Sequence, residues 1–446
     1  MRATFVHTAD NHLGYEQYGV KERFNDFAHA FFAVVDTAIE RHADFFVIAG
    51  DLFNKRAIDA MTLIQAQDAL QRLHAAGIPA IAIEGNHDRS YYRDGISWLQ
   101  FLCWQGLLNL LNPIVRDGIP VLAPWNQEAM RGAYVDLHGG ALRVYGLPWY
   151  GAGTARVMEQ FARELARVRP EEDAAGVRYR VLLLHTGVDG IMPQLHGLPT
   201  RAQFEPLRGL VDYVALGHVH KPYMIDNWLF NPGSTETWSA EESAWDRGFY
   251  VVTVDTDAPE GESPHHADLH VNPRRPFHRL VFRVDGLPDP SALYDRFERF
   301  AAREAAERVA AEPGASAPEP RQQPVVDVAL TGILGFDGAA LDRARLEESI
   351  ERHFHPLIAR IHDTTRDTDY DPETGDDGAD GRDRSTWHQL ELRIFQDLLA
   401  RDARYLPEAS RWAATLAELK QMALGGEEPA AIAAKLREAR ARLLNG

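Results

Sequence analysis

Five short segments that carry aspartate, asparagine or histidine are the strongest constraint on the fold of this 446-residue chain. Each segment follows an apolar stretch that is typical of a buried strand. Their polar residues are Asp10, His12, Asp51, Asn86, His87, His185, His218 and His220. Because the carboxyl ends of strands meet at one edge of an open α/β sheet, we expect these side chains to share one cavity. The sequence therefore predicts an α/β fold with its chemistry at the strand ends.

The combined ligand set fits a pair of divalent cations. Two ions held a few ångströms apart need roughly seven or eight protein ligands, with one carboxylate between them, to clamp an in-line phosphoryl displacement. Mixed carboxylate, imidazole and amide donors suit manganese or iron better than magnesium, which prefers oxygen. The single cysteine, Cys103, excludes a cysteine-built zinc site and a disulfide framework. A lone histidine at a strand end is more often a core residue, so the prediction depends on the whole ordered set.

The ordered set resembles the calcineurin-like metallophosphoesterase superfamily. The resemblance implies a four-layer α/β/β/α sandwich that binds two Mn²⁺ ions per chain, or other divalent metals. It implies that one ion is held by Asp10, His12, Asp51 and His220. It implies that the other ion is held by Asp51, Asn86, His185 and His218, so that Asp51 bridges the pair. His87 would then be the catalytic residue that stabilises the transition state or protonates the leaving oxygen. The alternative is that His87 only forms a hydrogen bond to a ligand.

Longer segments narrow the resemblance. They are HTADNHLGYEQ, AIEGNHDR, YVALGHVHKPY, NPGSTETWS and HQLELRIFQDLL. They are similar to the SbcD and Mre-eleven-type nucleases of double-strand-break repair. This implies a Mn-dependent DNA exonuclease and endonuclease that works with an SMC-like coiled-coil ATPase of the SbcC or Rad-fifty type. One departure is Asn54, where archaeal and eukaryotic members usually have histidine, because asparagine can donate a hydrogen bond but cannot supply a proton.

Four regions are predicted along the chain. Residues 1–257 alternate strands and helices and would form the nuclease domain, and the polar stretch that follows marks a boundary. Residues 265–365 would form a small α/β domain that the resemblance identifies as a DNA-capping domain. Residues 366–385 are expected to be a mobile, acidic linker. Residues 386–446 have a helical pattern. The pattern fits either a simple capping element or the element that binds the ATPase.

Contacts to DNA are harder to place from the sequence. The formal net charge of −18 argues against a surface that attracts nucleic acid everywhere. Aromatic and basic residues beside the ligand loops could still stack bases and neutralise phosphates. These candidates are Tyr15, Tyr18, Lys21, Arg23, Asn54 and Arg89. The alternative is that they are ordinary loop residues at the sheet edge.

Two apolar helical segments are candidates for a homodimer contact. The segment around Leu99 and Leu102 is too apolar for an exposed helix, so it belongs either to the core or to an interface. The family resemblance favours an interface that also includes Met61 and Leu63. Such a dimer would bring two active sites to one DNA groove.

The remaining features bear on location and on rival functions. The chain has no run of about twenty apolar residues and no signal-like start, so we expect a cytoplasmic, nucleoid-associated protein without a membrane partner. One rival function is a phosphoesterase of the same superfamily that acts on a phosphoprotein or a cyclic nucleotide. The other is a scaffold that tethers DNA ends. Residues 265–446 argue against the first rival, and the complete ligand set argues against the second.

Overall fold

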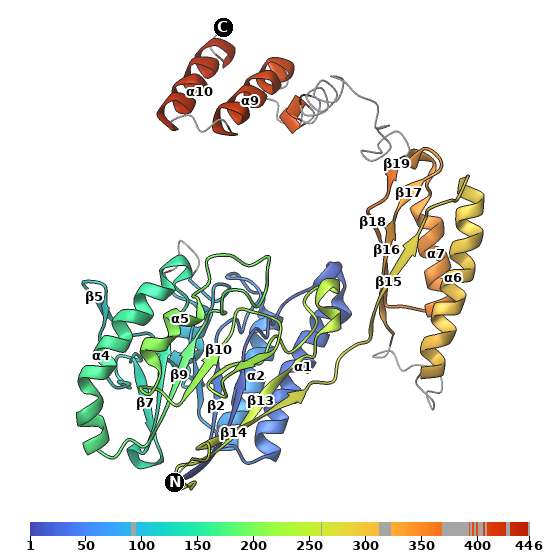
Figure 1. Ribbon diagram of the computed structural model, residues 1–446. Helices are drawn as coiled ribbons and strands as arrows, with labels where there is room; N and C mark the ends of the chain where they lie inside the picture. The colour runs from blue at the N-terminus through green and yellow to red at the C-terminus, as the bar shows by residue number, and fades with distance from the viewer. Residues whose placement is uncertain are drawn as a thin grey trace. The chain divides into compact units, whose positions relative to one another are not determined.

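In a computed structural model the chain forms two compact units, Met1–Asp369 and Tyr370–Gly446 (Figure 1). The described residues are 1–90, 95–259, 261–311, 323–367, 408–424 and 429–444, with a few more between 392 and 405. The first unit contains two sandwiched six-stranded sheets and a separate three-stranded sheet with its own helices.

The first six-stranded sheet has the order β14-β13-β1-β2-β3-β4. Its first four strands in the chain run parallel, and the last two are antiparallel additions at one side. The strands are β1 (Arg2–Thr8), β2 (Phe45–Ile48), β3 (Ala80–Ala82), β4 (Asn109–Leu110), β13 (Gly248–Asp255) and β14 (His265–Val271). The parallel arrangement brings the carboxyl ends of β1, β2 and β3 to the same edge.

The second six-stranded sheet has the order β11-β12-β10-β9-β8-β7. The middle four strands are parallel, and the two edge strands are antiparallel to their neighbours. The strands are β7 (Tyr134–Leu137), β8 (Leu142–Leu147), β9 (Tyr179–Leu184), β10 (Tyr213–Leu216), β11 (Tyr223–Ile225) and β12 (Leu229–Asn231). A small ribbon of β5 (Val115–Arg116) and β6 (Ile119–Pro120) lies outside both sheets.

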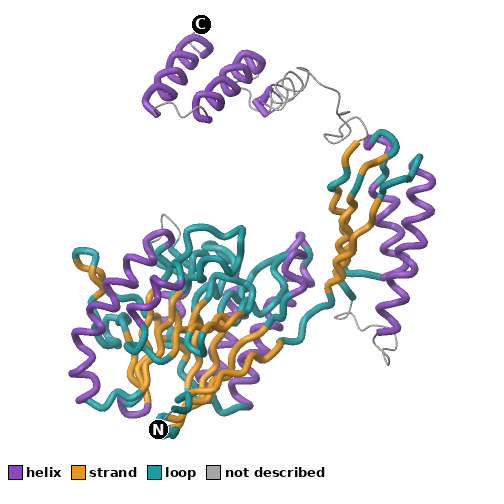
Figure 2. Tube along the Cα trace, viewed as in Figure 1, coloured by secondary structure: helices purple, strands orange, loops and turns teal. Residues whose placement is uncertain are grey.

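Helices cover the outer face of each sheet (Figures 1 and 2). The first sheet packs against α1 (Lys21–Glu40), α2 (Ala60–Ala75) and α3 (Trp98–Trp104). The second packs against α4 (Thr154–Ala174) and α5 (Arg201–Phe204). Asp59 precedes helix α2 as its N-cap, and its side chain accepts a hydrogen bond from the backbone N–H of Thr62 at 2.8 Å.

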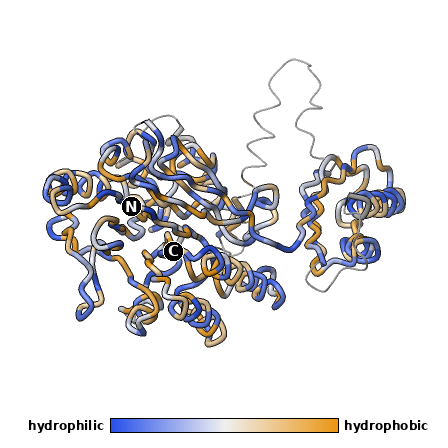
Figure 3. Tube along the Cα trace, turned by 90° about the horizontal axis from the view of Figure 1, so that it is seen from below, coloured by the Kyte–Doolittle hydropathy of each residue, from blue (hydrophilic) through white to orange (hydrophobic). Residues whose placement is uncertain are grey.

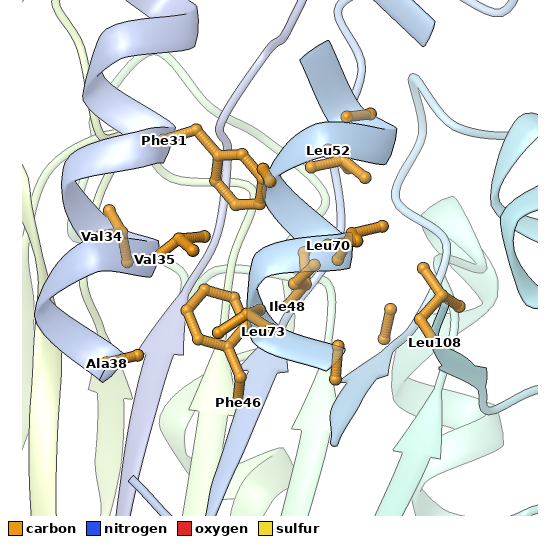
Figure 4. Close-up of a cluster of buried hydrophobic side chains, with 14 of the residues drawn as sticks. Phe31, Val34, Val35, Ala38, Phe46, Ile48, Leu52, Leu70, Leu73 and Leu108 are labelled. Carbon is orange, nitrogen blue, oxygen red and sulfur yellow. The ribbon is translucent and has the colours of Figure 1, made fainter. Parts of the chain in front are cut away.

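Side-chain alternation along β2 shows how the layers form. Phe46 and Ile48 point to the α1 and α2 side, where they join the core cluster drawn in Figure 4. Phe45 and Val47 point the other way and pack against the second sheet. A strand with both faces buried needs apolar residues at every position, which explains the unbroken FFVI sequence. The predicted four-layer α/β/β/α sandwich is therefore confirmed.

The three-stranded sheet has the parallel order β15-β16-β18, and helices α6 and α7 cover one of its faces (Figure 1). Its elements are β15 (Phe277–Arg283), α6 (Pro290–Ala311), β16 (Val325–Thr331), α7 (Arg343–Phe354) and β18 (Ile358–Asp363). A two-stranded pair, β17 (Ile333–Leu334) and β19 (Arg366–Asp367), continues from it. We refer to residues 277–367 as the second α/β domain.

One predicted domain boundary differs from the structure. The sequence pattern places residues 265–271 at the start of the second domain, but they form β14, which pairs with β13 from Gly248 to Val254. The polar residues between β13 and β14 are thus a hairpin connection and not a linker between domains. The boundary lies after Asn272, whose side chain donates hydrogen bonds to the carbonyl oxygens of Ala30 and Thr235.

The second unit is described mainly by two helices, α9 (Ala409–Leu424) and α10 (Pro429–Leu444). They pack against each other, and Lys435 forms an ion pair with Glu418 at 2.8 Å. Most of the expected linker at 366–385 lies outside the described residues. Hydrophobic and hydrophilic residues alternate along the helices (Figure 3). Among the helices of the described part, none combines the length and the apolar character needed to span a bilayer.

Candidate metal centre

The loops after β1 and β2 form the base of the site. The backbone N–H of Asp10 donates to the carbonyl oxygen of Gly50 at 3.1 Å, and the N–H of His12 donates to the carbonyl oxygen of Asp51 at 3.1 Å. These bonds continue the pairing of β1 and β2 past the sheet edge. They hold the side chains of Asp10, His12 and Asp51 close together, and each of the three is at most 2% exposed.

Four of the candidate ligands have an unusual backbone. Asp10, His12, Asp51 and His218 have φ angles of 51°, 49°, 52° and 81°. A positive φ is uncommon outside glycine and costs free energy, so it persists only where the surroundings hold it. Here it turns the side chains from separate strand ends toward a common point. Such strain clusters at functional sites.

Two glycines leave the space that the ligands fill. A Cβ atom at Gly85 would lie 2.1 Å from Oδ1 of Asp51. A Cβ atom at Gly50 would lie 2.3 Å from Nδ1 of His185, and Gly50 also has a φ of +93°. Both distances are far shorter than van der Waals contact. Any side chain at these two positions would therefore displace a candidate ligand.

The first ligand group contains Asp10, His12 and His220. Their ligand atoms lie within 4.8 Å of one another. The Nε2 atoms of His12 and His220 face each other at 3.0 Å. Asp10 is fixed because both of its oxygens accept the backbone N–H of His218, at 3.0 and 2.9 Å. Two imidazole nitrogens and a carboxylate oxygen so close together form a set of donors that suits a cation.

The second ligand group contains Asn86, His185 and His218, with Asp51 beside it. Nδ1 of His185 lies 2.7 Å from the carbonyl oxygen of Ala49, which only an N–H can satisfy. The lone pair of His185 is therefore on Nε2 when the ring is neutral. That atom faces Oδ1 of Asn86 at 3.1 Å and Oδ2 of Asp51 at 3.2 Å. With the ring neutral, three lone pairs meet at this point, an arrangement that a bound cation would stabilise.

The pKa shifts in the site also indicate that a positive charge would be stabilised there. Burial raises the pKa of Asp10 to about 6, although His185 and His220 oppose the shift. Burial alone would lower the pKa of His185, but the charge and hydrogen bond of Asp51 raise it to about 9. The pKa of Asp51 is well below its usual range because the neighbouring histidines outweigh its burial. The ligands favour a proton between them when no other cation is bound.

His87 lies beside both ligand groups. Its backbone N–H donates to Oδ1 of Asp51 at 2.8 Å, and its Nδ1 is 2.6 Å from the carbonyl oxygen of Asn54. Nδ1 must carry the proton of that bond, so Nε2 is the ring nitrogen left for other partners. His87 is also close enough to His12 and Asp51 for the three to offer ligand atoms within 4.8 Å.

The sequence analysis did not predict several residues that support the site. Asp88 is buried and accepts the backbone N–H groups of Phe53 and Gly85 at 3.0 Å each, which ties two ligand loops together. Glu242 accepts from Nδ1 of His220 at 2.9 Å. The buried Arg247 lies 3.1 Å from Glu242 and donates to the carbonyl oxygen of His220 at 2.8 Å. Asp88 stands within the GNHD motif, but nothing in the sequence marks Glu242.

An aromatic pair lies at the rim of the site. The ring of Trp238 stacks on Tyr15 with a centroid distance of 5.3 Å. Trp238 also contacts the rings of His12 and His220, at 6.1 and 5.5 Å. Its indole N–H donates to the side-chain oxygen of Asn54 at 3.3 Å. Asn54 is buried and supports Trp238 and His87, which differs from the expected direct contact to DNA.

The other predicted DNA contacts have mixed outcomes. Arg23 is fully buried, pairs with Asp26 and Glu236 at 2.7 and 3.1 Å, and is thus a structural residue and not a DNA contact. Lys21 and Arg89 are exposed, and Arg89 lies over the ring of Trp149 at 5.6 Å. Tyr15 and Tyr18 are half-buried, and Tyr18 lies under the guanidinium of Arg360 at 4.2 Å.

The predicted dimer residues also divide into two groups. Leu99 and Leu102 are fully buried in the core beside α1 and α2, so they are unavailable for a contact between chains. The sequence could not distinguish this from an interface, because both require apolar side chains. Met61 is 58% exposed and Leu63 is half-buried. Only these two of the four predicted residues are accessible to a partner.

Comparison with known proteins agrees with this geometry. Residues 3–222 match the model of the calcineurin-like phosphoesterase family. The DNA double-strand break repair protein Mre11 of Archaeoglobus fulgidus is 33% identical over 247 residues, which are 54% of this chain and 52% of that protein. The Mre11 protein of Aeropyrum pernix is 30% identical over 300 residues, or 66% of each chain. The chain thus spans about half to two thirds of the length of these relatives.

Proposed function

We propose that this chain, in which residues 3–222 form a calcineurin-like phosphoesterase domain, is a DNA nuclease that uses two Mn²⁺ ions to hydrolyse phosphodiester bonds. The observation that carries the proposal is the convergence of seven side chains on one small volume, in which ring nitrogens and side-chain oxygens lie 3.0 to 3.2 Å from one another. The similarity to double-strand break repair proteins supports DNA as the substrate.

The two ligand groups suggest how the ions are held. Asp10, His12 and His220 would bind one ion, and Asn86, His185 and His218 would bind the other. Asp51 would bridge them, since its two oxygens face different neighbours. When bound, a metal pair of this kind polarises the phosphoryl group and activates the attacking water. The second domain would cap the DNA, as the resemblance implies.

His87 is proposed as the residue that acts on the leaving group. The hydrogen bond from Nδ1 to the carbonyl oxygen of Asn54 fixes the ring and leaves Nε2 for the substrate. In the protonated, imidazolium form of the ring, Nε2 would donate a hydrogen bond or a proton to the leaving oxygen. Tyr15 and Trp238 would form a surface on which a base of an unpaired strand can stack. Exposed Lys21 and Arg89 would neutralise nearby phosphates, and half-buried Tyr18 would contribute to the same rim.

We also propose the assembly that the resemblance implies. A homodimer would use exposed apolar residues of α2 and the α3 region, which include Met61 at 58% exposure and Trp104 at 49%. An SMC-like coiled-coil ATPase would bind residues 386–446, of which α9 and α10 are described. Such an assembly on DNA would act in the cytoplasm, at the nucleoid.

A three-substrate assay tests the function. The purified chain is incubated with Mn²⁺ and linear duplex DNA, single-stranded DNA or a phosphoserine peptide. Cleavage of either DNA with no release of phosphate from the peptide is the expected result. Turnover of the peptide alone would contradict the proposal in favour of a phosphoprotein phosphatase. Inactivity on all three substrates, with and without the ATPase, would favour a tethering scaffold.

A further inference from the structure

The second α/β domain has a groove of about 460 Å³ that four arginines line. Arg283 comes from the end of β15, and Arg296, Arg299 and Arg303 come from α6. All four are exposed. We call this the arginine groove. It stands out because the whole chain has a net charge of −18 and because the metal centre is built on a different domain.

The spacing of the arginines on α6 explains the groove. The helix buries Leu293, Phe297 and Ala301 against the sheet, at intervals of four residues. Arg296, Arg299 and Arg303 fall on one flank of this buried stripe, because positions three and four apart share a helix face. At 1.5 Å per residue they extend over about 10 Å. The flank therefore presents a row of positive charge beside an edge strand.

The charges in the groove are largely uncompensated. Across the part of the chain that the structure describes, no carboxylate forms an ion pair with Arg283, Arg296 or Arg299. Arg303 does have partners, Glu304 at 2.9 Å and Glu307 at 3.7 Å. Other arginines of the same domain are paired as well, such as Arg352 with Glu298 at 2.7 Å. Three free guanidiniums side by side repel one another, so an anion is the ligand that would stabilise them.

The apolar residues that line the groove restrict the kind of anion that would fit it. Its apolar lining residues are Val281, which is 59% exposed, the half-buried Phe300 and the buried Phe282. The guanidinium of Arg303 lies 5.7 Å from the Phe300 ring. A ligand that suits the groove repeats its negative charge at intervals and has less polar groups between the charges. A sugar-phosphate backbone has both features, and guanidinium forks match phosphate geometry.

We propose that the arginine groove is a binding site for the phosphate backbone of nucleic acid, separate from the metal centre. This rests on the proposed nuclease function, because it assumes that the chain acts on DNA. The groove would hold duplex that is not being cut. It would therefore raise the affinity for long substrates and would leave the chemistry at the metal centre unchanged.

The test removes the three unpaired charges from the full chain with Mn²⁺ bound. The variant is Arg283→Gln, Arg296→Gln, Arg299→Gln. The control is Arg343→Gln, Arg345→Gln, Arg352→Gln, which removes the same charge from α7. Binding to a labelled, hydrolysis-resistant phosphorothioate duplex is measured at several salt concentrations. Loss of two to three phosphate contacts should reduce the slope of log K against log salt by about 2 to 3 and weaken binding at least about tenfold at low salt.

Each outcome decides the proposal. Weaker binding and a smaller slope in the groove variant alone, with unchanged melting temperature, would support it. An unchanged slope, or an equal loss in the α7 control, would overturn it. Unchanged DNA binding together with lost binding of polyglutamate would overturn it in favour of an acidic protein partner. Hydrolysis of bis(4-nitrophenyl) phosphate should be equal in all variants. If the unmodified chain cleaves neither this diester nor DNA, the proposed nuclease function is wrong. The binding data still decide whether the arginine groove binds DNA.

Discussion

The metal centre and the arginine groove collect charge in opposite ways. In the metal centre, buried carboxylates and imidazoles come from separate strand ends, and each is held by a defined hydrogen bond or a strained backbone. In the arginine groove, exposed guanidiniums come mainly from one helix flank and lack such constraints. Burial makes charge costly unless its partners are fixed. The first region is thus suited to chemistry, and the second to binding that salt can weaken.

The largest effect is expected from Asp51→Ala, which removes the carboxylate between the two ligand groups. We expect at least a thousandfold loss of DNA cleavage, roughly the size seen when a central catalytic group is removed. Mn²⁺ binding should fall with it. Equilibrium dialysis and a cleavage assay measure both. Asp268→Ala, at an exposed position on β14, should change neither. Full metal binding by the Asp51 variant would mean that Asp51 does not bridge the two ions.

Arg23→Gln tests whether a buried arginine contributes more to stability than an exposed one. Arg23 is fully buried between Asp26 and Glu236. Removing one partner of a buried ion pair leaves uncompensated charge and costs about 3–5 kcal/mol. Urea unfolding should show this loss of stability, whereas exposed Arg41→Gln should stay within about 0.5 kcal/mol. Equal stability of both variants would contradict the view that burial determines what an arginine does here.

The sequence predicted the metal centre because its constraints are local. Each candidate ligand follows a strand, and glycines such as Gly50 stand where a side chain would collide with a ligand. The layers were predicted for a similar reason, since an unbroken apolar strand such as β2 requires cover on both faces. These features depend on short stretches of sequence and on the geometry of an open sheet.

The remaining features depend on contacts between distant residues. Arg23 stands in a polar stretch that is typical of a surface loop. Its burial could not be predicted, because its carboxylate partner Glu236 is more than two hundred positions away. Leu99 is apolar, and apolar side chains suit a core and an interface equally. Glu242 meets His220 through a loop with no recognisable motif. Arginine is also too frequent in this chain for the groove to be visible before α6 and β15 are placed together.

His87→Ala should have a smaller effect than loss of Asp51, because His87 is proposed to act on the leaving group and not to hold metal. We expect both ions to stay bound and the rate of cleavage to fall by about two orders of magnitude. The rate at saturating Mn²⁺ is the measurement, and His74→Ala, at an exposed position near the end of α2, is the control. Loss of a metal ion in the His87 variant would assign His87 to the ligands, as its proximity to His12 and Asp51 would allow.

The smallest effect is expected at the edge of the metal centre, in Glu242→Gln. Glu242 accepts from Nδ1 of His220 and is itself paired with the buried Arg247. A carboxylate on the far side of a metal-binding imidazole fixes the ring and makes it a stronger ligand. Glutamine keeps the shape but loses the charge, so Mn²⁺ affinity should fall by about tenfold. Cleavage at saturating Mn²⁺ should recover, which distinguishes a positioning residue from a catalytic one.

Glu241→Gln is the matched control for this last variant, because Glu241 is the exposed neighbour and has no hydrogen bond to a ligand among the described residues. Its Mn²⁺ affinity should equal that of the unmodified chain. If both glutamine variants bind Mn²⁺ normally, then the hydrogen bond to His220 contributes packing only. The boundary of the metal centre would then lie at the seven ligands and His87. If only Glu242→Gln is weakened, the region of fixed charge extends outward through His220 to Arg247.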